Sequence, residues 1–198
     1  RLYCQGERTL ASAYAVECSG GVVGGLLATG FLLWGIQNLT IAALCSLVSL
    51  LVVIFTAERR DNQFRTVALM LSVLLLYLLW PLPEIDRRTT SWNHPNLLAS
   101  RDSAYGRITV AGLAGQVAVY ENDTLCFETE GTDAEAFVHL AALQHPRPGS
   151  VLLLGGALEG LIVEVQKHHP RQIVAVELNP VLVDTVRPYL PTTISESL

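Results

Sequence analysis

The chain has 198 residues, of which 51% are hydrophobic, and its mean hydropathy of +0.39 is high for a water-soluble domain. A net charge of −5 and basic runs of at most two residues argue against a nucleic-acid-binding protein. The four cysteines have no CxxC spacing and predict neither a disulfide framework nor a metal site; they are Cys4, Cys18, Cys45 and Cys126.

Apolar residues are concentrated in the first part of the chain. No charged residue lies between Glu17 and Glu58, and a second uncharged stretch runs over 66–83. Since a helix needs about 20 residues to cross about 30 Å of hydrocarbon, we expect a membrane domain at 1–86 with the lipid bilayer as its partner. The expected transmembrane helices cover roughly 16–36, 41–57 and 66–82, with the polar tetrad QNLT at 37–40 as the first turn and Trp80 at the membrane–water interface.

Small residues occupy one face of the first expected span. The sequence SGGVVGG places Gly20 over Gly24 and Gly21 over Gly25, a spacing that lets two membrane helices approach closely. We therefore expect this face to pack against another membrane helix. A phosphate-binding loop is excluded because no strand precedes these glycines.

The distribution of arginine gives an expected orientation in the membrane. The loop after the second span carries Arg59, Arg60 and Arg65, whereas the QNLT turn has no charge. By the positive-inside rule, this loop lies in the cytoplasm and the part after the third span lies outside. Arg87 and Arg88 follow the third span and reduce the contrast, so both orientations stay open.

After the membrane domain the chain has ordinary polarity. The polar segment 87–102 is expected to be a linker, and a small antiparallel β meander is expected over 103–132. Its strands are identified by alternating apolar residues, and they are RITVAG at 107–112, QVAVYE at 116–121 and TLCFET at 124–129.

The last part, 133–198, alternates helical and strand patterns and predicts the start of an α/β domain. A first helix is capped by Thr132 or Asp133. The apolar strand VLLL at 151–154 then runs into the glycine turn GGALEG and a second helix, and RQIVAVE at 171–177 is the next strand. Strand, glycine turn and helix in this order are typical of a Rossmann-like domain.

Four residues of this unit are candidate nucleoside-binding residues. Gly155, Gly156 and Gly160 allow a tight turn and a close approach of the backbone to a ligand. Glu177 lies 22 residues after Gly155, near the spacing of about 20 at which an acidic side chain meets ribose hydroxyls. A purely structural turn between a strand and a helix uses the same glycines, so both interpretations are kept.

The sequence also suggests a longer polypeptide. Two parallel strands cannot bury both faces of a sheet, so the α/β domain is expected to be truncated at Leu198 and to continue with further strands. The chain begins at Arg1 without a methionine or a signal-peptide pattern, and earlier sequence is therefore expected as well.

From about Ser103 to Pro191 the chain resembles the spermidine synthase (polyamine aminopropyltransferase) family, and more narrowly its bacterial versions fused behind membrane helices. The resemblance is carried by SAYGRITV at 103–110, HLAALQHP at 139–146, VLLLGGALEG at 151–160 and VAVELNPVLV at 174–183. It implies a Rossmann-like fold of the class I methyltransferase type and a multi-pass protein of the bacterial plasma membrane. It also implies aminopropyl transfer from decarboxylated S-adenosylmethionine to putrescine, with Glu177 at the ribose.

The family's glycine turn, GGGDGG, is altered in this chain. Ala157 and Leu158 stand where the family has its third glycine and its aspartate. Carboxylates are needed because two polycations share a pocket only if negative charges offset theirs, and a leucine cannot hold an ammonium group. Glu159 is adjacent and could substitute in part, but its side chain is expected to point elsewhere.

Two further motifs of the family are incomplete. Its Tyr-Gln pair corresponds to Tyr105-Gly106, so the glutamine is absent. Of its Tyr-His-Glu motif, which aligns with Asp133-Ala134-Glu135, only the glutamate is retained. The family's catalytic aspartate would follow a later strand, so no catalytic residue is assigned.

These observations leave three hypotheses. We favour a membrane-anchored, spermidine synthase-like protein with a partly degenerate site that serves as a binding or assembly subunit of a membrane complex, and we predict weak or no aminopropyl transfer. The alternative is an active aminopropyltransferase of polyamine synthesis, or a related transferase, using decarboxylated S-adenosylmethionine or a related nucleoside. A transport function is disfavoured because the expected spans contain no charged residue apart from Glu17 at the edge of the first.

Overall fold

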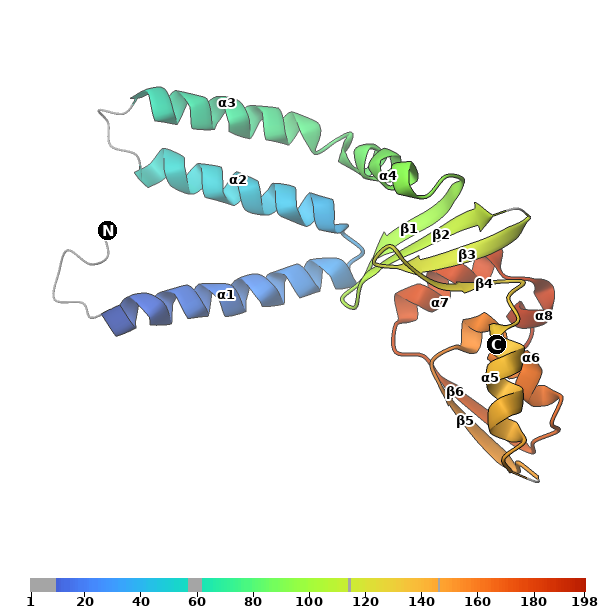
Figure 1. Cartoon of the computed structure of the whole chain (residues 1–198). Coiled ribbons are helices and arrows are strands. Elements are labelled where there is room, and N and C mark those ends of the chain that lie inside the picture. Colours follow the sequence, from blue (N-terminus) through green and yellow to red (C-terminus); the bar gives the residue numbers. More distant parts are fainter. Residues whose placement is uncertain (1–9, 57–61, 114, 146) are drawn as a thin grey trace. The chain divides into compact units, whose positions relative to one another are not determined.

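The computed structural model describes residues 10–56, 62–113, 115–145 and 147–198 (Figure 1). The chain divides into two compact units, Arg1–Pro83 and Glu84–Leu198. The first consists of apolar helices and the second is an α/β domain with an antiparallel sheet, which confirms the predicted order of the two parts. Among the residues used in the sequence interpretation, those outside the described residues are Arg1, Cys4, Glu58, Arg59 and Arg60.

Two described helices are long and apolar enough to cross a membrane, α1 (Leu10–Leu33) and α2 (Asn38–Thr56). α3 (Asn62–Leu78), with 17 residues, reaches that length only together with α4 (Leu82–Asn93), from which a bend separates it. The turn between α1 and α2 comes earlier than expected, because Gly35 has a left-handed φ of +80° that ends a helix.

The helices of the first unit differ in their packing. α2 and α3 contact each other, and Ala68 and Ser72 of α3 are buried. The Ser72 hydroxyl donates to the Ala68 carbonyl (2.7 Å), so its polar group is satisfied within the helix. By contrast, no residue of α1 is buried, and a Cβ added at any glycine of the SGGVVGG face would meet no atom within 4 Å. The partner helix expected for this face therefore stays a prediction.

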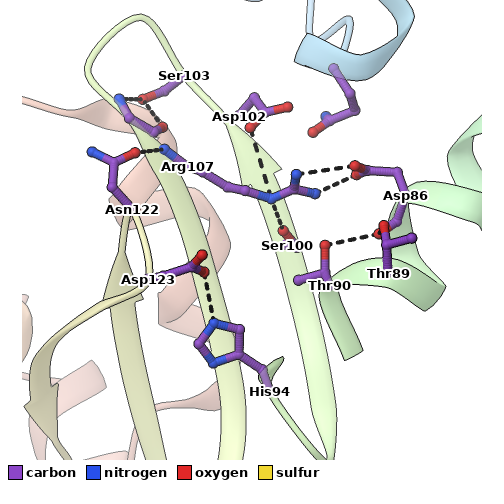
Figure 2. Close-up of polar contacts among 12 residues, drawn as sticks. Asp86, Thr89, Thr90, His94, Ser100, Asp102, Ser103, Arg107, Asn122 and Asp123 are labelled. Carbon is purple, nitrogen blue, oxygen red and sulfur yellow. Dashed lines mark hydrogen bonds and ion pairs between the residues drawn. The ribbon is translucent and has the colours of Figure 1, made fainter. Parts of the chain in front are cut away.

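The polar segment 87–102, expected as a linker, contains the second half of α4 and strand β1 (Leu97–Asp102). In α4 the hydroxyls of Thr89 and Thr90 donate to the carbonyl oxygen of Asp86 at 3.0 and 2.8 Å (Figure 2). The polar segment is therefore regular in structure, because its threonine hydroxyls are hydrogen-bonded within the domain.

A four-stranded antiparallel sheet follows, in the order β1-β2-β3-β4. Its other strands are β2 (Arg107–Leu113), β3 (Gln116–Glu121) and β4 (Thr124–Glu128). Asn122 and Asp123 have φ values of 50° and 64°, the conformation of a two-residue hairpin turn. The antiparallel meander predicted from the alternation of apolar residues is confirmed, and β1 is an additional strand.

The rest of the second unit contains a parallel pair of strands, β5 (Ser150–Leu154) and β6 (Gln172–Val176). Its helical elements are α5 (Asp133–Ala142), η2 (Ala157–Glu159), α6 (Leu161–Gln166), α7 (Pro180–Val186), η3 (Arg187–Tyr189) and α8 (Thr192–Ser195). The predicted order of helix, strand, glycine turn, helix, strand and helix is observed.

Two apolar clusters hold this unit together. The first joins the meander to the C-terminal helices and consists of Ile108, Val110, Val119, Leu158, Val186, Leu190 and Ile194. The second joins β5 to α5 and α6 and consists of Val138, Leu153, Ala157, Leu161, Ile162 and Val165. Since Leu158 belongs to the glycine turn, the first cluster fixes that turn against the meander.

The parallel strand pair buries only one of its faces. Side chains alternate between the faces of a strand, and Leu153 is 9% exposed whereas Leu152 and Leu154 are 60% and 77% exposed. Val174 and Val176 of β6 are exposed as well. In the described residues, this sheet therefore leaves open a face that parallel sheets ordinarily cover.

Candidate functional site

The turn after β5 has a left-handed backbone at each of its three glycines. Gly155, Gly156 and Gly160 have φ values of +78°, +73° and +90°, a region that favours glycine. A Cβ at Gly156 would lie 2.4 Å from Leu161 Cδ1, whereas one at Gly155 would meet no atom within 4 Å. The left-handed backbone thus favours glycine at 156, where a Cβ would also displace the Leu161 side chain, and the backbone at 155 is open to an approaching ligand.

Glu177 follows β6 and lies beside this turn. The N–H of Gly155 donates to the carbonyl of Val176 (2.9 Å), so the turn starts next to the residue that precedes Glu177. The carboxylate of Glu177 is partly buried and accepts a hydrogen bond from the N–H of Leu178 (2.9 Å). The glycine turn and the acid are adjacent at the carboxyl ends of two parallel strands, and their role in binding a nucleoside stays a prediction.

A cavity of about 730 Å³ lies between α5 and the carboxyl end of β5. This volume is within the range of small-molecule sites. Its lining includes Asp133, Phe137, Leu154, Gly155, Gly156 and Glu159. Of the four predicted binding residues, Gly160 and Glu177 are not among those that line it. Within the described ranges, no group of three or more His, Cys, Asp or Glu residues is placed to hold a metal ion.

The two central residues of the turn have opposite environments. Leu158, at the position of the family's aspartate, is 1% exposed and packed in the core, so that position does not face the cavity. Glu159 lines the cavity, and its Oε2 lies 3.7 Å from the place of a Cβ on Gly156. Glu159 and Leu158 point in different directions because a single 3₁₀ turn separates successive side chains by about 120°, and whether Glu159 substitutes for the aspartate of the family stays a prediction.

The surroundings of Glu159 are negatively charged. Burial raises the pKa of Glu159, and the charges of Glu177 and Asp133 raise it further. These three carboxylates come from α5, the glycine turn and the end of β6. A cationic ligand in the cavity would relieve their mutual repulsion.

Replacing Glu159 by glutamine is expected to flatten the pH dependence of stability. A carboxyl group whose pKa is raised on folding binds its proton more tightly in the folded state, so stability falls as the pH rises from the ordinary glutamate pKa through the raised one. The measurement is the urea midpoint of the full-length protein in detergent between about pH 4 and pH 8. Glu135→Gln, an exposed carboxylate on α5, is the control, and equal slopes in both variants would contradict this account.

Two residues that the sequence interpretation missed connect distant motifs. The side-chain amide of Asn179 donates to the Ser103 hydroxyl (3.0 Å) across 76 positions, and both residues are buried. Asn179 also caps α7 by accepting from the N–H of Val181 (3.1 Å), and the Ser103 hydroxyl donates to the Gly106 carbonyl (2.8 Å). The SAYG and ELNP motifs therefore meet. The signal in the sequence that could have predicted this contact is that both motifs resemble the same family.

The incomplete motifs also have structural contexts. A Cβ at Gly106, where the family has glutamine, would lie 2.6 Å from the side-chain amide of Asn122. Asn122 in turn accepts a hydrogen bond from the N–H of Arg107 (2.9 Å; Figure 2). Glycine at 106 thus fits the hairpin turn. The retained glutamate of the Tyr-His-Glu motif, Glu135, is not among the residues that line the cavity.

Fold and site together define an α/β domain with a glycine turn and carboxylates at the ends of parallel strands. Residues 130–197 match the family model of the spermine/spermidine synthase domain. The polyamine aminopropyltransferase of Pectobacterium atrosepticum is 33% identical over 100 residues, which are 50% of this chain and 32% of that protein. The spermine synthase of Saccharomyces cerevisiae is 32% identical over 98 residues, which are 49% of this chain and 30% of that protein.

Plant proteins are similar as well. The spermidine synthase of Solanum lycopersicum is 28% identical over 100 residues, or 50% of this chain and 27% of that protein. The C-terminal part of the chain is thus similar to the spermine and spermidine synthases, and the resemblance inferred from the motifs is confirmed. The chain spans about a third of the length of these relatives, so their activity comes to it only as a proposal.

Proposed function

We propose that this is a membrane-anchored, spermidine synthase-like protein whose domain binds a nucleoside at a partly degenerate site and serves as a binding or assembly subunit of a membrane complex. The proposal rests on a difference between residues of the glycine turn. Its left-handed glycines lie beside Glu177, whereas the position of the family's aspartate is occupied by the core residue Leu158. The glycine turn that would receive a nucleoside is retained, whereas the carboxylate expected to bind the aminopropyl donor is absent.

The nucleoside is bound at the carboxyl ends of β5 and β6, as in Rossmann-like domains. The open backbone at Gly155 permits close approach, and the Glu177 carboxylate is the acceptor for ribose hydroxyls. At present one oxygen of that carboxylate is held by the N–H of Leu178, which leaves its other lone pairs for a ligand. The implied ligand is decarboxylated S-adenosylmethionine or a related nucleoside.

The N-terminal helices provide the anchor. α1 and α2 have the length and apolar composition of membrane spans. α3, with 17 residues, lies at the short end of the range for a third span. In the orientation favoured by the arginines at 59, 60 and 65, the soluble domain lies outside a bacterial plasma membrane. Cytosolic donors do not reach that side, which favours a non-catalytic role.

An active aminopropyltransferase is the second candidate, and the cavity carboxylates favour it. Glu159 and Asp133 line the same cavity as Gly155 and Gly156. Carboxylates so placed are suited to hold the ammonium groups of a polyamine. Glu159 then supplies, from the neighbouring position, the negative charge that the aspartate of the family provides and Leu158 does not.

Calorimetric titration of the full-length protein with 5′-methylthioadenosine tests the nucleoside site. We expect binding by the wild type and about 10- to 100-fold weaker binding by Glu177→Ala, because hydrogen bonds to a charged group contribute about 1.5–3 kcal/mol. Glu135→Ala, which removes a carboxylate outside the cavity lining, should bind as the wild type does. A wild type that does not bind the nucleoside would refute the proposal, and formation of spermidine from putrescine and donor would favour the active alternative.

A further inference from the structure

Helix α4 has one polar face that is fixed to the meander. Asp86 accepts hydrogen bonds from both terminal nitrogens of Arg107 on β2, one of them at 3.0 Å (Figure 2). Arg107 Nε donates to the Ser100 hydroxyl on β1 (2.9 Å). The Asp86 side chain is only 12% exposed. The ion pair therefore determines which face of α4 is turned toward the sheet.

The residue that follows α4 strengthens this attachment. His94 Nε2 lies 2.9 Å from Asp123 Oδ1 in the hairpin turn, and the His94 ring lies 4.4 Å from the ring of Tyr120, centroid to centroid. His94 is buried, with 5% of its surface exposed. The meander thus holds α4 at Asp86, in its first half, and at the residue that follows its C-terminal end.

The opposite face of α4 is exposed and has a different composition. Ile85, Arg88 and Trp92 are three and seven positions apart, a spacing that places them on one side of a helix. Trp92 is 79% exposed and Ile85 is 36% exposed. Arg88 is exposed and paired with Glu84 at 3.0 Å. An aromatic ring, a branched aliphatic side chain and an arginine on one face are typical of helices that lie at a lipid surface.

We propose that α4 lies flat in the membrane–water interface, with Ile85 and Trp92 among the lipid headgroups, and that it thereby holds the meander at the membrane surface. This inference rests on the proposed membrane anchoring by the preceding helices. α4 starts four positions after Leu78, the end of α3, a separation that the backbone bridges over at most about 14 Å.

The residue between α3 and α4 and the charged residues within α4 favour lipid as the partner of the exposed face of α4. Trp80, between α3 and α4, is 92% exposed, and tryptophan is enriched at the headgroup level of membranes. α4 carries four charged side chains within 12 residues, Glu84, Asp86, Arg87 and Arg88, which excludes it from the hydrocarbon core. The interface accommodates both features, since it contacts water and apolar chains at once.

Depth-dependent fluorescence quenching tests the placement. Full-length protein is reconstituted into vesicles containing an anionic lipid, with one tryptophan retained in each variant: Trp92 in Trp34→Phe/Trp80→Phe, or Trp80 in Trp34→Phe/Trp92→Phe. All three tryptophans are exposed, so these variants should fold. We expect Trp92 to lose most of its fluorescence with lipids brominated near the headgroup, and little with lipids brominated near the bilayer centre.

The two variants distinguish the interfacial position of α4 from the membrane anchoring on which it rests. Quenching of Trp80 but not of Trp92 would overturn the interfacial position of α4 and leave the membrane anchor intact. If neither tryptophan were quenched by brominated lipid, the anchor and the inference would both fail. A Trp92 that is shielded from aqueous iodide but not quenched by lipid would indicate a protein partner on this face and would also overturn the proposal.

Discussion

Leu158→Asp is expected to unfold the second unit instead of restoring an acidic turn. The Leu158 side chain is 1% exposed and belongs to the cluster that contains Val110, Val119 and Val186. An aspartate there would lose the apolar contacts and bury a carboxyl group without a partner. Together these effects cost about 4 kcal/mol or more, a large share of the stability of an ordinary domain.

Two control variants distinguish the effect of the buried position from the effect of introducing a charge. Leu158→Met conserves the volume and should cost less than about 1.5 kcal/mol. Leu140→Asp introduces the same charge at a residue that is 70% exposed on α5 and outside the cavity lining, and should change stability by about 0.5 kcal/mol. The measurement is proteolysis of the full-length protein in increasing urea. A Leu158→Asp protein as resistant as the wild type would show that residue 158 is not in the core.

Arg107→Gln should detach α4 from the meander and cost about 3 kcal/mol, because it leaves Asp86 buried without its counter-charge. The side chains of Arg107 and Asp86 are 24% and 12% exposed. Burial opposes the charge of Arg107, but the hydrogen bond to Asp86 and the charges of Asp102, Asp86 and Asp123 outweigh it and raise the pKa of Arg107.

Hydrogen exchange of the α4 amides and urea unfolding report this effect. Arg88→Gln breaks an exposed ion pair on the same helix and should cost no more than about 0.5 kcal/mol. The double variant Asp86→Leu/Arg107→Met replaces both charges by apolar groups and should recover much of the loss. Unchanged exchange of α4 in Arg107→Gln would contradict the role assigned to the ion pair.

The sequence predicted those features of the fold that depend on local patterns. Alternating apolar residues identified β2, β3 and β4, and the glycines identified the turn after β5, because both signals follow from backbone geometry. α4 and β1 were not predicted. Asp86 of α4 and Ser100 of β1 are bonded to Arg107, which lies 21 and 7 positions further along the chain, and composition alone does not distinguish such residues from a solvated linker.

The candidate site was predicted less completely than the fold. The position of Gly155 beside the strand that ends before Glu177 follows from the pairing of parallel strands. The inward direction of Leu158 and the outward direction of Glu159 depend on the 3₁₀ turn between two left-handed glycines, which no periodicity reveals. The bond between Asn179 and Ser103 joins separate motifs and is visible only after folding.

The Asn122 side chain in the β3–β4 hairpin constrains what residue 106 can be. A side chain at 106 would displace the Asn122 amide, which accepts a hydrogen bond from the first N–H of β2. A glutamine at 106 is therefore expected to be tolerated better when Asn122 is replaced by a smaller residue that adopts a positive φ, such as glycine. The hairpin turn and the residue at 106 thus have to be changed together.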